Sequence, residues 1–70
     1  MSLRWTDVHA LGELLYDARP ELEPLSVRFT DLMQWVLELE EFEDDPSRCG
    51  ERVLEAIQMA WYSEWKEDNL

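Results

Sequence analysis

Three prolines divide this chain of 70 residues into stretches that can each form one helix. Pro20 and Pro24 follow the first stretch and Pro46 begins the last, because proline has no backbone N–H to donate and clashes inside a helix. Within each stretch, apolar residues recur every three or four positions, which is the period of an α-helix. No series of strand-like runs competes with this pattern. The sequence therefore predicts an all-α protein, a small three-helix orthogonal bundle of helix-turn-helix-like type.

The beginning of each predicted helix carries a capping signal. The segments Trp5-Thr6-Asp7 and Phe29-Thr30-Asp31 both place an aromatic residue before a threonine and an acidic residue after it. A threonine side chain can accept a hydrogen bond from the first turn of a helix, and a negative charge in that turn interacts favourably with the helix dipole. The predicted caps are Thr6 and Thr30 for the first two helices, and Asp45 or Ser47 for the third.

A chain of this length is expected to form one small domain, residues 1–70, with residues 66–70 as a frayed tail. The tryptophans at core spacing are Trp5, Trp35 and Trp61, and Trp35 and Trp61 are predicted to share one core. Trp65 comes so late in the chain that we expect it to stay partly exposed beside Tyr62. Gly12, inside the first helix, indicates either close approach of another backbone or a tolerated weak position.

The charge of the chain limits its partners. It carries 17 Asp and Glu against 6 Lys and Arg, a formal net charge of -11, which repels nucleic acid and anionic lipid. We therefore expect basic proteins or cations as partners, and neither nucleic acid nor a membrane. Cys49 is the only cysteine, so no disulfide can form within the chain, and no apolar run is long enough to span a bilayer. These features predict a cytoplasmic protein.

An acidic segment from Glu38 to Asp45 places six carboxylates within eight residues, around the apolar residues Leu39 and Phe42. The spacing of the preceding apolar residues predicts that Glu38, Glu40 and Glu41 lie in the last turn of the second helix, where negative charge opposes the helix dipole. A bound cation or a basic partner surface would offset this cost. The alternative is a solvated helix end that nearby arginines partly neutralise. The candidate arginines are Arg48 and Arg52, on one face of the third helix.

The acidic residues match no motif for tight metal binding. The segment lacks the glycine and the closing glutamate of a calcium-binding EF-hand loop, and His9 is the only histidine. A surface of carboxylate oxygens can still bind ferrous iron, manganese, calcium or magnesium weakly, with Glu13 and Asp17 as further candidate ligands. Cys49 is interpreted as a structural residue. No Ser-His-Asp or Cys-His set is available, so we do not expect an enzyme.

The order and spacing of four motifs carry a family resemblance. The motifs are Trp5-Thr6-Asp7, Arg28-Phe29-Thr30-Asp31, Trp35 and Phe42-Glu43-Asp44-Asp45-Pro46. From about Leu3 to Trp61 the chain resembles the IscX family of iron–sulfur cluster assembly proteins. This resemblance implies a modified winged-helix fold made of helices, weak ferrous iron binding by surface carboxylates, and binding to the cysteine desulfurase that supplies sulfur. It also implies an adaptor or iron-linked regulator that competes with frataxin for a basic surface.

The resemblance assigns roles to particular carboxylates. The predicted metal ligands stand at the acidic-loop and first-helix positions of the family, and they are Glu40, Glu41, Glu43, Asp44, Asp45, Glu13 and Asp17. The predicted partner-binding residues are Glu38, Glu40, Glu41, Glu43, Asp44 and Asp45. A second functional class stays open, in which the chain is a DNA-mimic-like acidic decoy. Such a protein would occupy a basic surface on its partner without any metal.

Overall fold

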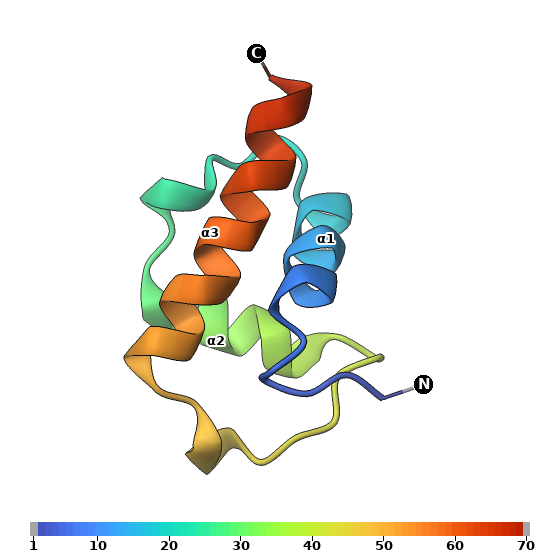
Figure 1. Cartoon of the computed structure of the whole chain (residues 1–70), viewed down its shortest axis with the longest axis vertical. Coiled ribbons are helices and arrows are strands. Elements are labelled where there is room, and N and C mark those ends of the chain that lie inside the picture. Colours follow the sequence, from blue (N-terminus) through green and yellow to red (C-terminus); the bar gives the residue numbers. More distant parts are fainter. Residues whose placement is uncertain (1, 70) are drawn as a thin grey trace.

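A computed structural model describes residues 2–69, which contain three α-helices and two short 3-10 helices (Figure 1). In chain order these are α1 (Val8–Ala18), η1 (Pro24–Ser26), α2 (Phe29–Glu38), η2 (Pro46–Arg48) and α3 (Glu51–Asp68). Within residues 2–69, β-type pairing is limited to one isolated bridge between Leu3 and Phe42. The predicted all-α class is therefore confirmed, and the more specific winged-helix-like arrangement stays a prediction.

Helices α1 and α3 lie side by side, and α2 runs across them (Figure 1). Gly12 of α1 stands where the two backbones are closest. A Cβ atom built on Gly12 would lie 2.7 Å from the backbone nitrogen of Trp61 and 2.9 Å from the Cβ of Ala60. Real Cβ atoms essentially never approach other atoms so closely. Close approach of another backbone is thus the correct interpretation of this glycine.

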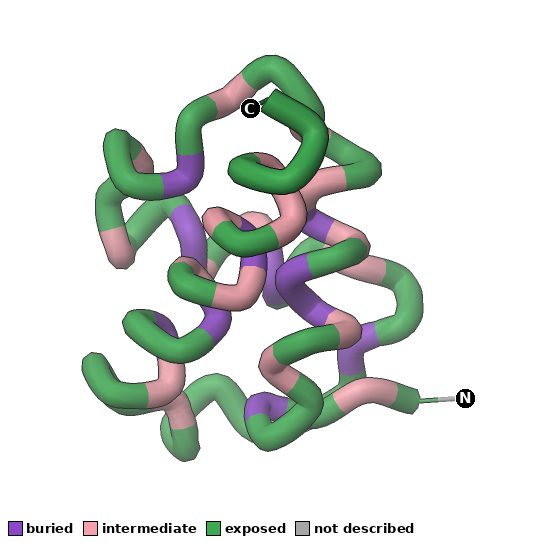
Figure 2. The backbone as a smooth tube through the Cα atoms, turned by 45° about the horizontal axis from the view of Figure 1, so that its top comes forward, coloured by how far each residue is buried: buried purple, intermediate pink, exposed green. Residues whose placement is uncertain are grey.

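The core lies where the three helices face one another, and Figure 2 shows the buried positions on their inner sides. The buried apolar residues are Trp5, Leu11, Leu15, Leu32, Val36, Phe42, Leu54, Ile57 and Trp61. Trp35 is half-buried and packs edge-to-face on Trp61, with 6.2 Å between the ring centroids. The prediction that these two tryptophans share one core is confirmed. Trp65 is partly exposed and stacks on Tyr62, also as predicted.

Helix α1 begins later than the sequence predicts. The backbone N–H of Asp7 donates to the carbonyl of Arg4, and the Asp7 carboxylate accepts a hydrogen bond from the N–H of Arg4. These two bonds close a turn over Trp5 and Thr6. Because Thr6 lies inside this turn, Asp7 takes the N-cap position and α1 begins at Val8. The prediction of Thr6 as the cap is wrong.

The predicted caps of the other two helices are wrong as well. Arg28 has an extended backbone and occupies the N-cap position of α2, so Thr30 lies inside the first turn of that helix. Helix α3 begins at Glu51 after Gly50, because η2 and a short extended link separate it from the acidic segment. The turn of η2 uses the capping residues that were expected to serve α3.

The C-terminal part of α3 continues beyond the point where fraying is predicted. Asn69 caps its end: the backbone N–H donates to the Lys66 carbonyl at 3.3 Å, and the side-chain amide donates to the Trp65 carbonyl at 2.7 Å. Leu70, the last residue of the predicted tail, lies outside the described residues. Within residues 2–69, no helix is both long and apolar enough to cross a membrane.

A side chain of α3 fixes the connector between α1 and α2. The Gln58 amide donates hydrogen bonds to the carbonyls of Pro24 and Val27, at 2.9 and 3.3 Å. Pro24 itself is fully buried. These contacts hold η1 against α3 and leave the preceding residues of the connector beside the C-terminal end of α1.

Candidate functional site

The acidic segment leaves the helix earlier than predicted. Helix α2 ends at Glu38, and Leu39 has an extended backbone. The N–H of Phe42 donates to the Leu39 carbonyl and closes a turn, so Glu40 and Glu41 lie in that turn and not in the last turn of α2. Only Glu38, of these three residues, opposes the helix dipole, and the electrostatic cost of the segment is smaller than the sequence suggests.

The N-terminal segment holds the acidic segment in place. The N–H of Leu3 donates to the Glu41 carbonyl at 2.7 Å, and the Leu3 carbonyl accepts from the N–H of Glu43 at 2.8 Å. The buried Phe42 ring packs edge-to-face on Trp5, with 4.6 Å between the ring centroids. Sequence reasoning missed the role of Leu3, because no local signal pairs residues so far apart in the chain.

Asp44 is bonded to two backbone N–H groups. Its carboxylate accepts hydrogen bonds from the N–H of Trp5 at 3.1 Å and from that of Asp45 at 2.7 Å. These bonds stabilise the charged form and hold the pKa of Asp44 below its ordinary value of 3.8, and the positive charges of Arg48 and Arg4 act in the same direction. Asp44 therefore has a structural role in addition to its charge.

Asp45 and Glu43 also accept hydrogen bonds within the chain. The Asp45 carboxylate accepts from the N–H of Ser47 at 2.9 Å and from its hydroxyl at 2.8 Å, which caps η2 and lowers the pKa of Asp45. The Glu43 carboxylate accepts from the Ser2 hydroxyl at 2.9 Å. Asp45 thus caps η2, whereas the sequence predicts it as a cap of the third helix.

Glu38, Glu40 and Glu41 form what we call the exposed half of the acidic segment: they are exposed and not firmly hydrogen-bonded, whereas Glu43 and Asp45 are exposed but bonded within the chain. Glu38 accepts one long hydrogen bond of 3.4 Å from Gln34 on the preceding turn, which is too long to hold the side chain firmly. The structure thus divides the six carboxylates into two groups. Glu43, Asp44 and Asp45 accept hydrogen bonds of 3.1 Å or less, while Glu38, Glu40 and Glu41 are exposed and are not held in this way within residues 2–69.

The two arginines predicted to neutralise the segment occupy different elements. Arg48 lies in η2 and Arg52 in α3, so they do not share one helical face. Arg48 contributes to the lowered pKa of both Asp44 and Asp45. The positive charge of Arg48 therefore acts on two carboxylates of the hydrogen-bonded half of the segment.

Glu13 and Asp17 lie on the exposed side of α1 and act on a different group of carboxylates. Partial desolvation raises the pKa of Glu64 on α3, and the charges of Glu13, Glu67, Asp68 and Asp17 raise it further. Within residues 2–69, no three Asp, Glu, His or Cys side chains gather into a group that could hold a metal ion. The predicted ligands therefore form a carboxylate surface and not a preassembled metal cage.

His9 and Cys49 show no arrangement typical of a reactive centre. His9 is exposed on α1. Cys49 is half-buried after η2, and desolvation raises the pKa of its thiol, which favours the unreactive protonated form. This environment agrees with a structural role for Cys49.

Comparison with known proteins establishes the family. A family model described as iron-sulphur cluster assembly matches residues 3–66. A Pseudomonas aeruginosa protein described as uncharacterized is 56% identical over 64 residues, which are 91% of this chain and 97% of that relative. The chain therefore belongs to the iron–sulfur cluster assembly family that its motifs predict, the IscX family.

Proposed function

We propose that this protein is an adaptor that docks on the cysteine desulfurase of iron–sulfur cluster assembly. The observation that carries the proposal is the construction of the acidic segment. Backbone hydrogen bonds from Leu3 and Trp5 fix the segment, while Glu38, Glu40 and Glu41 stay exposed. A charged surface that is already ordered loses little conformational entropy when a partner binds.

The proposed contact is electrostatic. The chain has a net charge of -11, and six of its 17 acidic residues lie in the acidic segment. Such a charge distribution attracts a basic surface and increases the rate of encounter. Exposed charges are screened within about 8 Å at physiological ionic strength, so the affinity should fall as salt rises. Another acidic assembly protein such as frataxin would compete for the same basic surface.

We also propose weak binding of ferrous iron, which would link this adaptor to the iron supply. The exposed carboxylates offer hard oxygen ligands, but within residues 2–69 they form no preassembled group. One or two carboxylates with water in the remaining positions would give low affinity and poor selectivity. Anaerobic titration with ferrous iron tests this. Cys49→Ser should bind as the parent does, because one half-buried thiol cannot hold the ion alone.

Charge reversal at the exposed half of the segment tests the docking. We expect Glu40→Lys with Glu41→Lys to abolish binding of the purified cysteine desulfurase, measured by calorimetry at low and physiological salt. The control is Glu55→Lys with Glu67→Lys, two exposed positions on α3 that change the net charge equally. If both pairs of substitutions weaken binding equally, binding depends on the net charge of the chain and not on the acidic segment in particular. Unchanged binding by the first pair refutes the proposal.

A metal-independent acidic decoy is the second candidate function. It is favoured by the same finding that no metal-holding group is preassembled within residues 2–69. The desulfurase adaptor and the decoy differ in their partner and in their response to iron. Binding measured with ferrous iron and with a chelator separates an iron-linked adaptor, whose affinity changes, from a decoy, whose affinity does not.

A further inference from the structure

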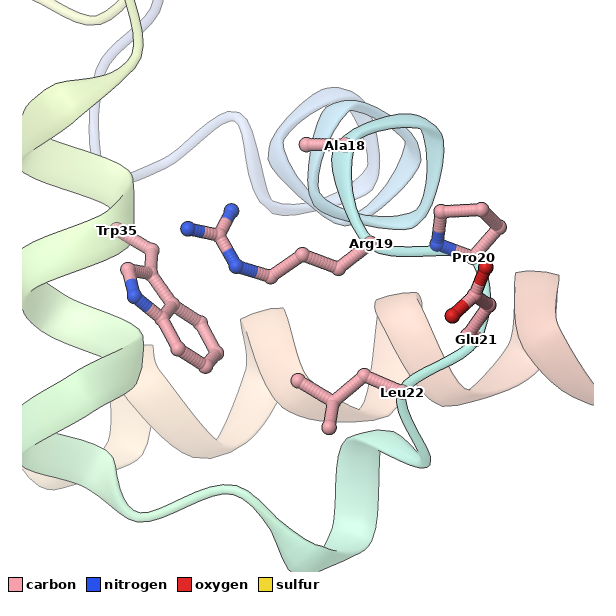
Figure 3. A pocket seen from close by; sticks show the side chains of 6 residues that line it. All are labelled: Ala18, Arg19, Pro20, Glu21, Leu22 and Trp35. Atoms are coloured by element: carbon pink, nitrogen blue, oxygen red, sulfur yellow. The ribbon is translucent and has the colours of Figure 1, made fainter.

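An open groove of about 620 Å³ lies between the C-terminal end of α1, the connector that follows it, and α2. Figure 3 shows its lining side chains. Ala18, Pro20, Leu22 and the Trp35 ring supply apolar surface, while Arg19 and Glu21 supply charge. An apolar floor with a few polar groups at the edge is the usual composition of a binding groove.

Two aromatic contacts fix the wall of the groove. The Arg19 guanidinium lies over the Trp35 ring, 4.1 Å from its centroid, in a cation–π contact. On the core side, Trp35 packs edge-to-face on the fully buried Trp61. The methylene stem of Arg19 extends the apolar surface while its charge is directed to the indole (Figure 3). The groove is therefore formed before any partner arrives.

Carboxylates lie at the groove and on the neighbouring turns of α2, while the positive charge of the lining residue Arg19 is engaged by the Trp35 ring. Glu21 lines it directly. Asp31 and Glu38 lie one helical turn before and after Trp35 on α2, are exposed, and so share its flank of the helix. Glu38 also belongs to the exposed half of the acidic segment, which makes the groove continuous with the proposed docking surface. An occupant must tolerate this charge.

We propose that the groove receives an apolar side chain from a protein segment that carries lysine or arginine on both sides of that residue. The apolar side chain packs between Trp35, Leu22 and Ala18, and the basic residues meet the carboxylates around the groove. This inference rests on the proposed docking, because it places a second contact for the same basic partner one turn along α2. It adds an apolar anchor to a surface otherwise recognised by charge.

Blocking the groove from its exposed edge tests the inference. Ala18 is exposed at the end of α1, so Ala18→Trp fills the groove without removing a core contact. The matched control is Ala56→Trp, an exposed alanine on α3. We expect Ala18→Trp to weaken desulfurase binding at least about tenfold, the loss typical of an anchor residue. The dependence of affinity on salt should not change, because the lost contact is apolar.

Two checks keep this result interpretable. Melting curves report whether Ala18→Trp folds, and the smaller pair Ala18→Gln and Ala56→Gln replaces it if it does not. Sedimentation of the parent shows whether a second copy of the chain fills the groove. Unchanged desulfurase binding by the blocked variant, or self-association that the block abolishes, overturns the inference. The charge-reversal pair in the acidic segment tests the docking separately.

A second measurement does not depend on the desulfurase. The tripeptides Arg-Leu-Lys and Glu-Leu-Glu, with acetylated N-termini and amidated C-termini, are titrated into the protein. The NMR signals of the Trp35 indole and the Leu22 methyl groups are followed. We expect the basic peptide to shift these signals and Ala18→Trp to remove the shifts. No shift with the basic peptide, or equal shifts with both peptides, refutes the proposed occupant even if desulfurase binding by the acidic segment stands.

Discussion

The indole N–H of Trp5 donates a hydrogen bond of 2.9 Å to the backbone carbonyl of Asp45, 40 positions later in the chain. The backbone N–H of the same tryptophan donates to the Asp44 carboxylate, and its ring packs on Phe42. Three contacts of one residue therefore fix the conformation of the acidic segment. Any function of that segment depends on Trp5, although Trp5 itself is buried.

We predict that Trp5→Phe destabilises the fold by about 1–3 kcal/mol, because the Asp45 carbonyl loses its donor and the smaller ring leaves a cavity. Denaturant unfolding measures the loss. Hydrogen exchange should also become faster at the Glu43 N–H, which donates to the carbonyl of Leu3, two residues before the tryptophan.

The comparison for this variant is Trp61→Phe. The Trp61 indole N–H is buried without a hydrogen-bond partner in residues 2–69, so this change costs volume but no hydrogen bond. It should lower stability without selectively increasing exchange at Glu43. Equal local exchange in both variants would show that the Trp5–Asp45 bond does not hold the acidic segment.

The hydrogen bonds to Asp44 should make the stability of the fold depend on pH in the acidic range. Its pKa in the folded state lies below the ordinary value of 3.8, chiefly because the N–H groups of Trp5 and Asp45 stabilise the charge. The stabilising contribution is therefore complete above the ordinary value and is lost as pH falls toward the folded pKa. We expect Asp44→Asn to be less stable than the parent at pH 7 and to lose less stability between about pH 4 and pH 2. Urea midpoints across this range measure the effect, and identical pH profiles would contradict it.

Glu64 should affect stability in the opposite direction to Asp44, because its charged form is unfavourable in the folded state. Its pKa is raised above the ordinary value of 4.5, first by desolvation and then by neighbouring carboxylates that include Glu13 and Asp17. The folded state therefore binds a proton more readily than the unfolded state, and stability falls as pH rises through this window. We expect Glu64→Gln to raise the melting temperature at pH 7 and to have little effect at about pH 3.5, where the carboxyl is protonated in both states. A gain of the same size at both pH values would exclude charge repulsion as its cause.

The helices can be predicted from the sequence because their signals are local. Pro20, Pro24 and Pro46 separate them, and apolar spacing places Trp35 and Trp61 in one core. The starting residues cannot be predicted in the same way. The turn between Arg4 and Asp7 competes with capping by Thr6, and nothing local decides between the two.

The acidic segment is evident from the sequence, but which of its carboxylates are held by hydrogen bonds is not. That difference between the carboxylates depends on contacts from Leu3 and Trp5, which reach the segment only after the chain has folded. The groove cannot be predicted from the sequence for the same reason. Arg19 and Trp35 belong to different elements, and their contact depends on how the connector passes α3.

The last prediction concerns Gly12, where sequence left two interpretations and the structure selects one. In an ordinary helix interior, Gly12→Ala would stabilise by about 1 kcal/mol. Here the added Cβ would meet the backbone nitrogen of Trp61 and the Cβ of Ala60, at 2.7 and 2.9 Å. Backbone atoms cannot rotate away, so α1 must move from α3, and we expect a net destabilisation of about 1–3 kcal/mol.

Gly50→Ala is the matched control, because a Cβ on Gly50 would have no atom within 4 Å. It should lower the free energy of unfolding by only a few tenths to about 1 kcal/mol, because alanine is a poorer N-cap residue than glycine. Denaturant unfolding of both variants separates the two effects. If Gly12→Ala were as stable as the parent or more so, the packing of α1 on α3 would be looser than the structure shows. The position of Trp61 in the core, and the packing of Trp35 on it, would then not be fixed by the close contact of α1 and α3.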